Sequence, residues 1–290
     1  MILEKIYKET SHFIIRSVNT LTSLLKIVVL SRFNIRMPKI KTESCAILGN
    51  GPSLKTSLEK HKDFFQKHSL ICVNMFALTE EYTVLKPEFY VLLDPAFWLS
   101  DIKVVTDTLE AIKIKTTWPI QIFIPQLSSK ISRFKELPKL NKHVSIVYFN
   151  YSIFNGFILI GHWLFSKNLA MPQSQNVLVA ALFLSINLGF KKIYLFGADH
   201  TWHENLHVDE NNILCIKNLH FYDKEKIIEF IPFKKHTQTD ETFKIHEIFT
   251  TWGKTFYGYI ALENYSKYRS SKIYNASEVS FIDAFERKKI

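Results

Sequence analysis

Short apolar runs that alternate with helix-like segments are the feature that most limits how this chain can fold. The runs lie at residues 44–48, 70–73, 89–93, 120–124, 144–148 and 192–196. Apolar strands separated by helices are typical of a mainly parallel sheet that is covered by helices on both faces. The sequence therefore predicts an α/β fold. Its 47% hydrophobic residues are enough to fill the core of such a fold.

A glycine-rich turn joins the first apolar run to the next helix, which is expected over residues 52–66. Gly49 and Gly51 flank Asn50, and Pro52 and Ser53 start the helix. Glycines let a backbone approach a ligand closely, and the N-terminus of a helix attracts phosphate. The turn lacks the third glycine of the dinucleotide motif and the Gly-Lys-Ser/Thr of a Walker loop. It predicts a nucleotide site, with a turn that binds no ligand as the alternative.

Polar residues also follow three other predicted strands. Asn74, Asp94 and Asp199 each come directly after an apolar run. Ligands of open parallel sheets bind beyond the carboxyl ends of the strands, so these side chains are expected beside the glycine turn. Residues 200–235 form a long polar and aromatic stretch with no clear periodicity, which we interpret as a lid over the site.

Histidines are the candidates for proton transfer and for metal binding. His200, His203 and His207 follow Asp199, but their spacing matches no standard zinc motif, so no metal is expected. His236 precedes a predicted helix start, and an imidazole there can serve as a general base near neutral pH.

The N-terminal 40 residues form a separate segment in front of a core domain at 41–290. Residues 11–32 are apolar but carry Arg16 and Lys26, so we expect neither a spanning helix nor a signal peptide. Apolar residues recur at alternating steps of four and three, at Ile14, Val18, Leu21, Leu25 and Val28. Such an amphipathic helix suits a membrane interface, another subunit of a homo-oligomer, or the chain's own domain.

The charge indicates the class of partner, and the cysteines indicate the redox environment. The formal net charge is +10, which favours acidic partners such as nucleotide phosphates or anionic lipid. Lys and Arg are spread along the chain without a nucleic-acid-binding motif, so nucleic acid is not expected. The three cysteines fit no zinc pattern, and a reduced cytoplasmic setting is expected.

The order of these sequence segments resembles the order found in a known family. The segments GNGPSL (49–54), CVN (72–74), DPAFW (94–98), LGFKKIYLFGAD (188–199) and KHTQTD (235–240) resemble the bacterial sialyltransferases of glycosyltransferase family 42. The resemblance covers about 44–240, and its first and fourth segments are the most specific. A broader group, the motility-accessory-factor and MptE-like proteins, shares the loop and the Gly-x-Asp strand end.

This resemblance implies a Rossmann-like GT-A variant that uses a CMP-activated sugar without an obligatory metal. Asn50 and Gly51 would approach the cytidine phosphate, and Asn74 would hold the donor. His236 would deprotonate the acceptor hydroxyl, and CMP would leave with inversion. Further implied positions are Asp94 near the donor, Asp199 at the ribose or as a positioning group, and Ser174, Gln175 and Asn176 near the sugar carboxylate.

The sequence also departs from that family. The family uses tyrosines to assist the departing phosphate, and the aligned positions here carry Thr201, His207 and Phe233. His207 or Tyr222 would then take over that task. A segment that carries a positive charge in the family is Ser174–Asn176 here, so the donor is either sialic acid or a related ulosonic acid, or another nucleotide sugar.

Three hypotheses follow. The first is a CMP-sugar-dependent glycosyltransferase that acts on a surface-glycan or lipid-linked acceptor, in the cytoplasm at the inner membrane of a bacterium. The second is a Mg²⁺-dependent phosphotransferase or diphosphokinase of the MptE-like type, with Asp94 and Asp199 as metal ligands. The third is a non-catalytic nucleotide-binding protein.

Overall fold

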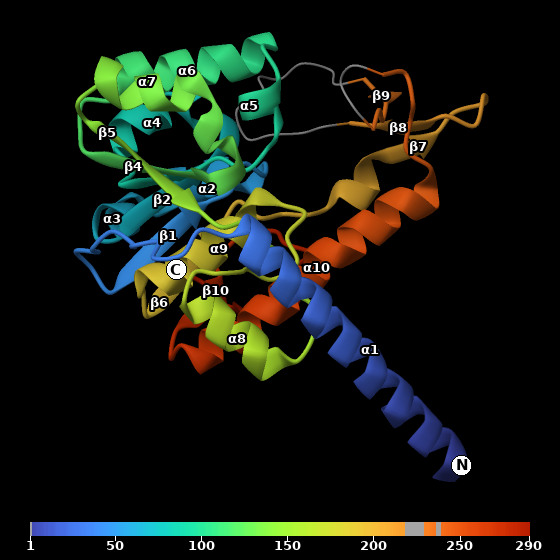
Figure 1. Cartoon of the computed structure of the whole chain (residues 1–290). Coiled ribbons are helices and arrows are strands. Elements are labelled where there is room, and N and C mark those ends of the chain that lie inside the picture. The colour runs from blue at the N-terminus through green and yellow to red at the C-terminus, as the bar shows by residue number, and fades with distance from the viewer. Residues whose placement is uncertain (1, 218–228, 236–238) are drawn as a thin grey trace.

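The computed structural model describes residues 2–217, 229–235 and 239–290. Its centre is an eight-stranded sheet in the order β11-β10-β6-β1-β2-β3-β4-β5, and every neighbouring pair is parallel (Figure 1). The strands are β1 (Ser44–Leu48), β2 (Ser69–Val73), β3 (Phe89–Val91), β4 (Ile120–Pro125), β5 (Val144–Phe149), β6 (Lys192–Phe196), β10 (Lys272–Asn275) and β11 (Glu286–Arg287). The predicted parallel α/β fold is confirmed.

Helices cover both faces of this sheet. They are α1 (Ile2–Leu30), α2 (Ser53–Lys60), α3 (Lys62–Gln66), α4 (Glu81–Leu85), α5 (Ala96–Leu99), α6 (Lys103–Lys115), α7 (Ser132–Leu140), α8 (Ile158–Ser166), α9 (Val177–Leu188) and α10 (Ile245–Tyr268). Short 3₁₀ turns are η1 (Asn74–Leu78), η2 (Gln126–Lys130) and η3 (Trp202–Asn205). The helix expected over 52–66 is divided at His61, where α2 ends and α3 begins.

Alternate side chains of each strand enter two different cores. In β1, Cys45 and Ile47 join the core under α8, α9 and α10. Ala46 and Leu48 join the core under α2 to α7. Successive strand residues point to opposite faces, so a sheet covered on both sides needs the continuous apolar runs seen in the sequence.

The region expected to be a lid contains a second, smaller sheet. Strands β7 (Leu206–Val208), β8 (Leu214–Ile216) and β9 (Ile231–Pro232) pair antiparallel in that order. Figure 1 places it beside the N-terminal end of α10 and away from the main sheet. Hydropathy patterning missed these strands because two or three residues are too short to show a period.

The N-terminal helix is longer than the sequence suggested. It runs from Ile2 to Leu30, and its stretch Tyr7–Leu30 is long and apolar enough to cross a membrane by length and composition alone. The expectation that no stretch meets that criterion is therefore wrong. Core helices and signal sequences can meet the same criterion, so the helix's contacts must decide how it is used.

Backbone contact between two glycine turns fixes where the sheet's central strands end. Gly49 N–H donates to the Phe196 carbonyl and Gly51 N–H donates to the Gly197 carbonyl, both at 2.8 Å. A Cβ on Gly49 would lie 2.5 Å from the Gly197 oxygen. Gly197 itself has φ +61, a left-handed conformation that favours glycine. The turns after β1 and β6 therefore pack backbone against backbone.

We expect Gly197→Ala to lower the free energy of unfolding by about 3 kcal/mol, from left-handed strain and overpacking together. Its Cβ would meet the Gly49 oxygen at 2.5 Å and Leu54 Cβ at 2.7 Å. The matched control is Gly253→Ala in α10, where a Cβ meets no atom within 4 Å. That change should instead raise stability by about 0.5–1 kcal/mol. Urea unfolding measures both, and equal effects would contradict the packing described.

Candidate functional site

The β1 and β6 turns are also joined by a buried carboxylate. Asp199 Oδ2 accepts the Ser53 N–H at 2.8 Å, and its Oδ1 accepts the Ser53 hydroxyl at 2.5 Å. The carboxylate therefore occupies the N-terminus of α2, where its negative charge meets the positive end of the helix dipole. Burial raises the pKa of Asp199, and the hydrogen bonds from Ser53 oppose that rise.

This arrangement changes the expected role of the glycine turn. The N–H groups of Gly49, Gly51 and Ser53 donate to Phe196, Gly197 and Asp199. A phosphate at the start of α2 would have to displace a carboxylate of the same charge. These amides hold two turns of the protein together, and the phosphate contact expected for Asn50 and Gly51 stays a prediction.

Two asparagine side chains beside this junction have unused hydrogen-bonding capacity. Asn50 Nδ2 donates to the Val73 carbonyl at 3.2 Å, while Asn50 Oδ1 is buried and has no partner among the described residues. Rotating that amide would turn its oxygen toward the Val73 oxygen, so the orientation is fixed. Asn74 Oδ1 is likewise buried and unpartnered in the described part of the chain. A buried oxygen without a donor is costly, so a donor from a ligand is the simplest way to satisfy it.

A third amide at the same edge of the sheet differs from these two. Gln126 Oε1 also has no donor among the described residues, but Gln126 Nε2 meets the Ser129 hydroxyl at 3.0 Å. A hydroxyl can donate as well as accept, so rotating this amide would satisfy its oxygen without a ligand. Gln126 therefore does not indicate a binding site.

The position of Asn74 depends on a tyrosine that the sequence did not single out. Asn74 has φ +48, a left-handed conformation that asparagine tolerates better than most residues. The Tyr90 hydroxyl donates to the Asn74 carbonyl and accepts the Ala77 N–H at 3.0 Å. Tyr90 is fully buried in β3, so the neighbouring strand fixes the turn that carries Asn74.

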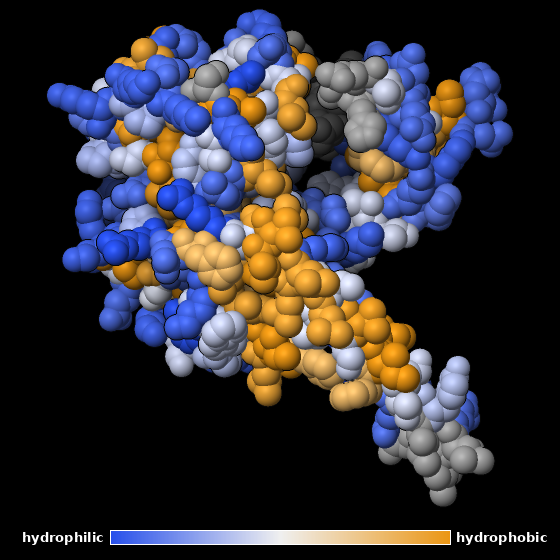
Figure 2. Space-filling model, viewed as in Figure 1, coloured by the Kyte–Doolittle hydropathy of each residue, from blue (hydrophilic) through white to orange (hydrophobic). Residues whose placement is uncertain are grey.

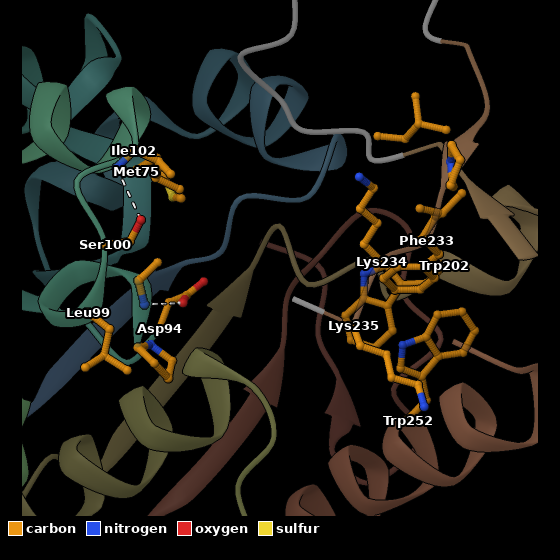
Figure 3. Close-up of a pocket in the computed structure, with 15 residues that line it drawn as sticks. Met75, Asp94, Leu99, Ser100, Ile102, Trp202, Phe233, Lys234, Lys235 and Trp252 are labelled. Atoms are coloured by element: carbon orange, nitrogen blue, oxygen red, sulfur yellow. Dashed lines mark hydrogen bonds between the residues drawn. The ribbon is translucent and has the colours of Figure 1, made fainter. Parts of the chain in front are cut away.

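A cavity of about 1050 Å³ opens next to this edge of the sheet. Met75, Asp94, Leu99 and Ser100 form one wall, and Figure 3 shows them facing Trp202, Phe233, Lys234, Lys235 and Trp252 across the gap. Asp94 is exposed, and its Oδ1 accepts the N–H of Ala96, the first residue of α5, at 2.8 Å. Trp202 and Trp252, whose ring centroids are 5.6 Å apart, were missed because single aromatics carry no sequence motif.

The histidines after Asp199 fall into different environments. His200 is buried, its Nε2 lies 2.6 Å from the Tyr259 hydroxyl, and its ring stacks on Trp202. Burial lowers the pKa of His200 to about 3, so it is neutral at physiological pH. His207 lies in β7 and is exposed, with its ring tilted against that of Phe230, and Thr201 is half-buried just before η3.

The predicted sugar-carboxylate segment lies at the start of α9. Asn176 Oδ1 accepts the Leu178 N–H at 2.6 Å and caps the helix, and Ser174 is buried with its carbonyl bonded to the Tyr151 hydroxyl. Gln175 between them is exposed. Since α9 runs back to the start of β6, its N-terminus belongs to the carboxyl edge of the sheet, although none of these three residues lines the cavity.

Two further predictions concern His236 and a metal. His236 lies outside the described residues, while its chain neighbour Lys235 lines the cavity and pairs with Glu241 and Glu247. Within residues 2–217, 229–235 and 239–290, no group of three or more His, Cys, Asp or Glu could hold a metal ion.

Comparison with known families shows which family this chain belongs to. The family model described as "6-hydroxymethylpterin diphosphokinase MptE-like" matches residues 18–205, which is more than half of the 290 residues. The chain belongs to the MptE-like family. The resemblance to that group, predicted from the glycine turn and the Gly-x-Asp strand end, is thus confirmed.

Comparisons with solved structures and with curated proteins give less information about this MptE-like protein than the family model does. A solved structure, the monofunctional α-2,3-sialyltransferase Cst-I from Campylobacter jejuni, matches with a TM-score of 0.45 and 15% identity. The match covers 89% of this chain and 85% of that one. Similarity at this level supports no conclusion about activity. No curated protein gives a significant match.

The buried His200 predicts a pH dependence of stability for this MptE-like chain. The unfolded state takes up a proton near pH 6.5, whereas folded His200 does so only near about 3. Stability should therefore fall as pH drops through this window, by up to about 1.4 kcal/mol per pH unit.

His200→Asn should flatten that dependence, since asparagine tolerates the φ of +55 and does not titrate. Asp199 acts in the opposite direction, because its raised pKa means that acidification favours the folded state. The difference between wild type and variant isolates His200, since both keep Asp199. Urea midpoints measured across the window provide the test, and parallel curves would contradict a buried neutral His200.

Proposed function

We propose that this protein is a glycosyltransferase that moves a sugar from a CMP-activated donor to a hydroxyl of a surface-glycan or lipid-linked acceptor. The donor sugar is sialic acid or a related ulosonic acid. The reaction needs no metal. The single observation that carries this proposal is the pair of amide oxygens on Asn50 and Asn74 that have no partner among the described residues, beside the turn that resembles that of the family 42 sialyltransferases.

The chemistry of Asn50 indicates which part of a nucleotide it would hold. Its Oδ1 needs a donor, and phosphate oxygens only accept. A ribose hydroxyl or the exocyclic amine of cytosine supplies such a donor. In this proposal Asn50 therefore binds the nucleoside rather than the phosphate. The Asn74 amide has no hydrogen-bond partner among the described residues that fixes its orientation, so it can donate to the phosphate or accept from the sugar.

The remaining steps of the reaction are assigned to other residues of the chain. His236 takes the proton of the acceptor hydroxyl, whose oxygen bonds to the anomeric carbon of the donor. The bond from that carbon to the phosphate oxygen breaks, and CMP departs with its electron pair, so the carbon inverts. Thr201, His207 and Phe233 replace the tyrosines expected at the leaving phosphate, and His207 is the one of these three that can donate a proton.

The acceptor side is assigned to the aromatic wall of the cavity. Trp202, Trp252 and Phe233 present flat apolar surfaces opposite Asp94 (Figure 3). Sugar rings offer apolar C–H faces together with hydroxyls, which suits a wall of aromatics near polar groups. An acceptor attached to a lipid or a surface glycan places the enzyme in the cytoplasm, at the inner membrane of a bacterium.

Membership of the MptE-like family favours a second candidate, a Mg²⁺-dependent diphosphokinase. That chemistry would use Asp94 and Asp199 as metal ligands. Both oxygens of Asp199 already accept hydrogen bonds from Ser53, and Asp94 Oδ1 accepts the Ala96 N–H. A shared metal would require both interactions to rearrange, so we rank this candidate second.

Nucleotide binding separates these candidates. We expect CMP to raise the melting temperature in the presence of EDTA, because a ligand that binds only the folded state stabilises it by mass action. UMP, GDP and ATP should have smaller effects. Stabilisation by ATP only with Mg²⁺ would favour the diphosphokinase. No effect of CMP at millimolar concentration would contradict the glycosyltransferase proposal.

His236→Ala should lower turnover of the CMP-sugar by about 10²-fold or more, the scale of losing a general base. CMP binding should survive, since the imidazole acts on the acceptor. The matched control is His246→Ala, because His246 is exposed on α10 outside the cavity lining. Release of CMP from a CMP-sugar gives the rate, and equal rates for the two variants would remove His236 from the mechanism. CMP binding without turnover of any CMP-sugar would indicate a non-catalytic protein.

A further inference from the structure

The apolar stripe of α1 faces away from the protein. Leu21, Leu25 and Val28 are 63%, 68% and 68% exposed, and Ile14 and Val18 are exposed as well. These are the residues whose spacing predicted an amphipathic helix. Isolated exposed apolar residues are ordinary, but a continuous stripe on one helix marks a contact surface.

The opposite, more polar face of α1 packs on the body. Thr20, Ser23, Ile27 and Ser31 are buried. The Ser23 hydroxyl donates to the Asn155 carbonyl at 3.0 Å, and the Ser31 hydroxyl donates to the Leu169 carbonyl at 2.8 Å. The contact is close, since a Cβ on Gly156 would lie 2.1 Å from Thr20 Oγ1. Docking the helix on its own domain therefore leaves its apolar stripe uncovered.

A second helix extends this apolar surface. Leu159 and Trp163 of α8 are 72% and 52% exposed, and they lie one turn apart on the same helix. The start of α8 lies against α1, where the rings of Phe13 and Phe157 are 5.5 Å apart. Figure 2 shows a band of hydrophobic colour that follows α1 and widens where the helix meets the body. We call these exposed apolar residues of α1 and α8 the two-helix face.

The charges beside the two-helix face are mostly basic, and the acidic residues of α1, Glu4 and Glu9, lie in its first turns. Residues 10–42 contain Arg16, Lys26, Arg32, Arg36, Lys39 and Lys41 and no Asp or Glu. Residues 150–176, which include α8, contain Lys167 and also no acidic residue. A two-fold contact between two copies would bring these positive charges together, with fewer acidic residues than basic ones to pair with them. An anionic lipid surface complements them.

The docked half of α1 also argues against a spanning helix. From Phe13 onward the helix contacts the body, which leaves residues 2–12 projecting, about 17 Å of helix. That projecting part carries Glu4, Lys5, Lys8 and Glu9, whereas a span needs about 20 mainly apolar residues. The helix is better placed to lie in the plane of a membrane than to cross it.

We propose that the two-helix face binds an anionic bilayer surface, with α1 and α8 lying in the membrane interface. Their apolar side chains enter the boundary between headgroups and acyl chains, while the basic residues meet lipid phosphates. Trp163 suits this depth because its ring is apolar at one end and polar at the other. This proposal is independent of the activity proposed above.

The test is flotation of the full-length protein with vesicles. We expect binding to vesicles of equimolar phosphatidylcholine and phosphatidylglycerol, and weaker binding to phosphatidylcholine alone. Replacing Leu21→Gln and Leu25→Gln together should lower the partition coefficient by about tenfold or more, from the lost apolar burial. The matched control replaces Ile114→Gln and Leu127→Gln, which are 67% and 65% exposed outside the two-helix face. The control should bind as wild type does.

Three outcomes would overturn the proposal. The first is equal binding by the two double variants, with unchanged melting temperatures. The second is a combination of two results: the wild type sediments as a dimer whereas the Leu21→Gln/Leu25→Gln variant sediments as a monomer, and vesicles bind neither of them. That combination would assign the face to a second copy of the chain. The third is retention in cell membranes after alkaline carbonate extraction, which would indicate a spanning helix.

Discussion

The hydrogen bonds between Asp199 and Ser53 connect the parts on which the candidate site depends. They join the turn after β6 to the start of α2, and they act alongside the backbone contacts of Gly49, Gly51 and Gly197. A carboxylate buried among these groups would be costly if unpaired, and here it meets two donors and a helix dipole. The two central strands, β1 and β6, therefore end at a fixed separation. Asn50 lies on one of these turns, and β2 places Asn74 next to it.

This use of Asp199 decides what the site can do. Because the start of α2 already holds a negative charge, the proposed mode of binding uses the glycine turn to support the site rather than to cradle the phosphate. Among the described residues, the amide oxygens of Asn50 and Asn74 have no donor, and both suit hydroxyl or amine donors. The cavity next to this edge of the sheet is lined by two indoles and two lysines, which bring aromatic surface and positive charge to the same space. The nucleoside contacts proposed for the two amides, beside this aromatic wall, fit transfer of a sugar better than chemistry that runs through a metal held by Asp94 and Asp199.

Much of the fold could be predicted from the sequence, because strands buried on both faces give apolar runs that are visible in one dimension. The strand ends could also be predicted, and Asn50, Asn74 and Asp199 do lie at one edge of the sheet. The bond from Asp199 to Ser53 could not, since the two residues are 146 positions apart and the expected partner was a ligand. The role of Tyr90 could not be predicted, because in the sequence a tyrosine in a buried strand cannot be distinguished from any other core residue. The stripe on α1 was correctly predicted as a helical face, but its spacing could not say that the polar side would dock and the apolar side would stay exposed.

The most direct measurement is a crystal structure of the protein with CMP, grown without divalent metal. The account predicts a ribose hydroxyl or the cytosine amine within hydrogen-bond distance of Asn50 Oδ1, and the sugar-bearing phosphate on the side of Asn74. It also predicts that both hydrogen bonds between Asp199 and Ser53 remain. A phosphate seated at the start of α2 in place of the Asp199 carboxylate would contradict the account. So would a nucleotide bound elsewhere on the molecule.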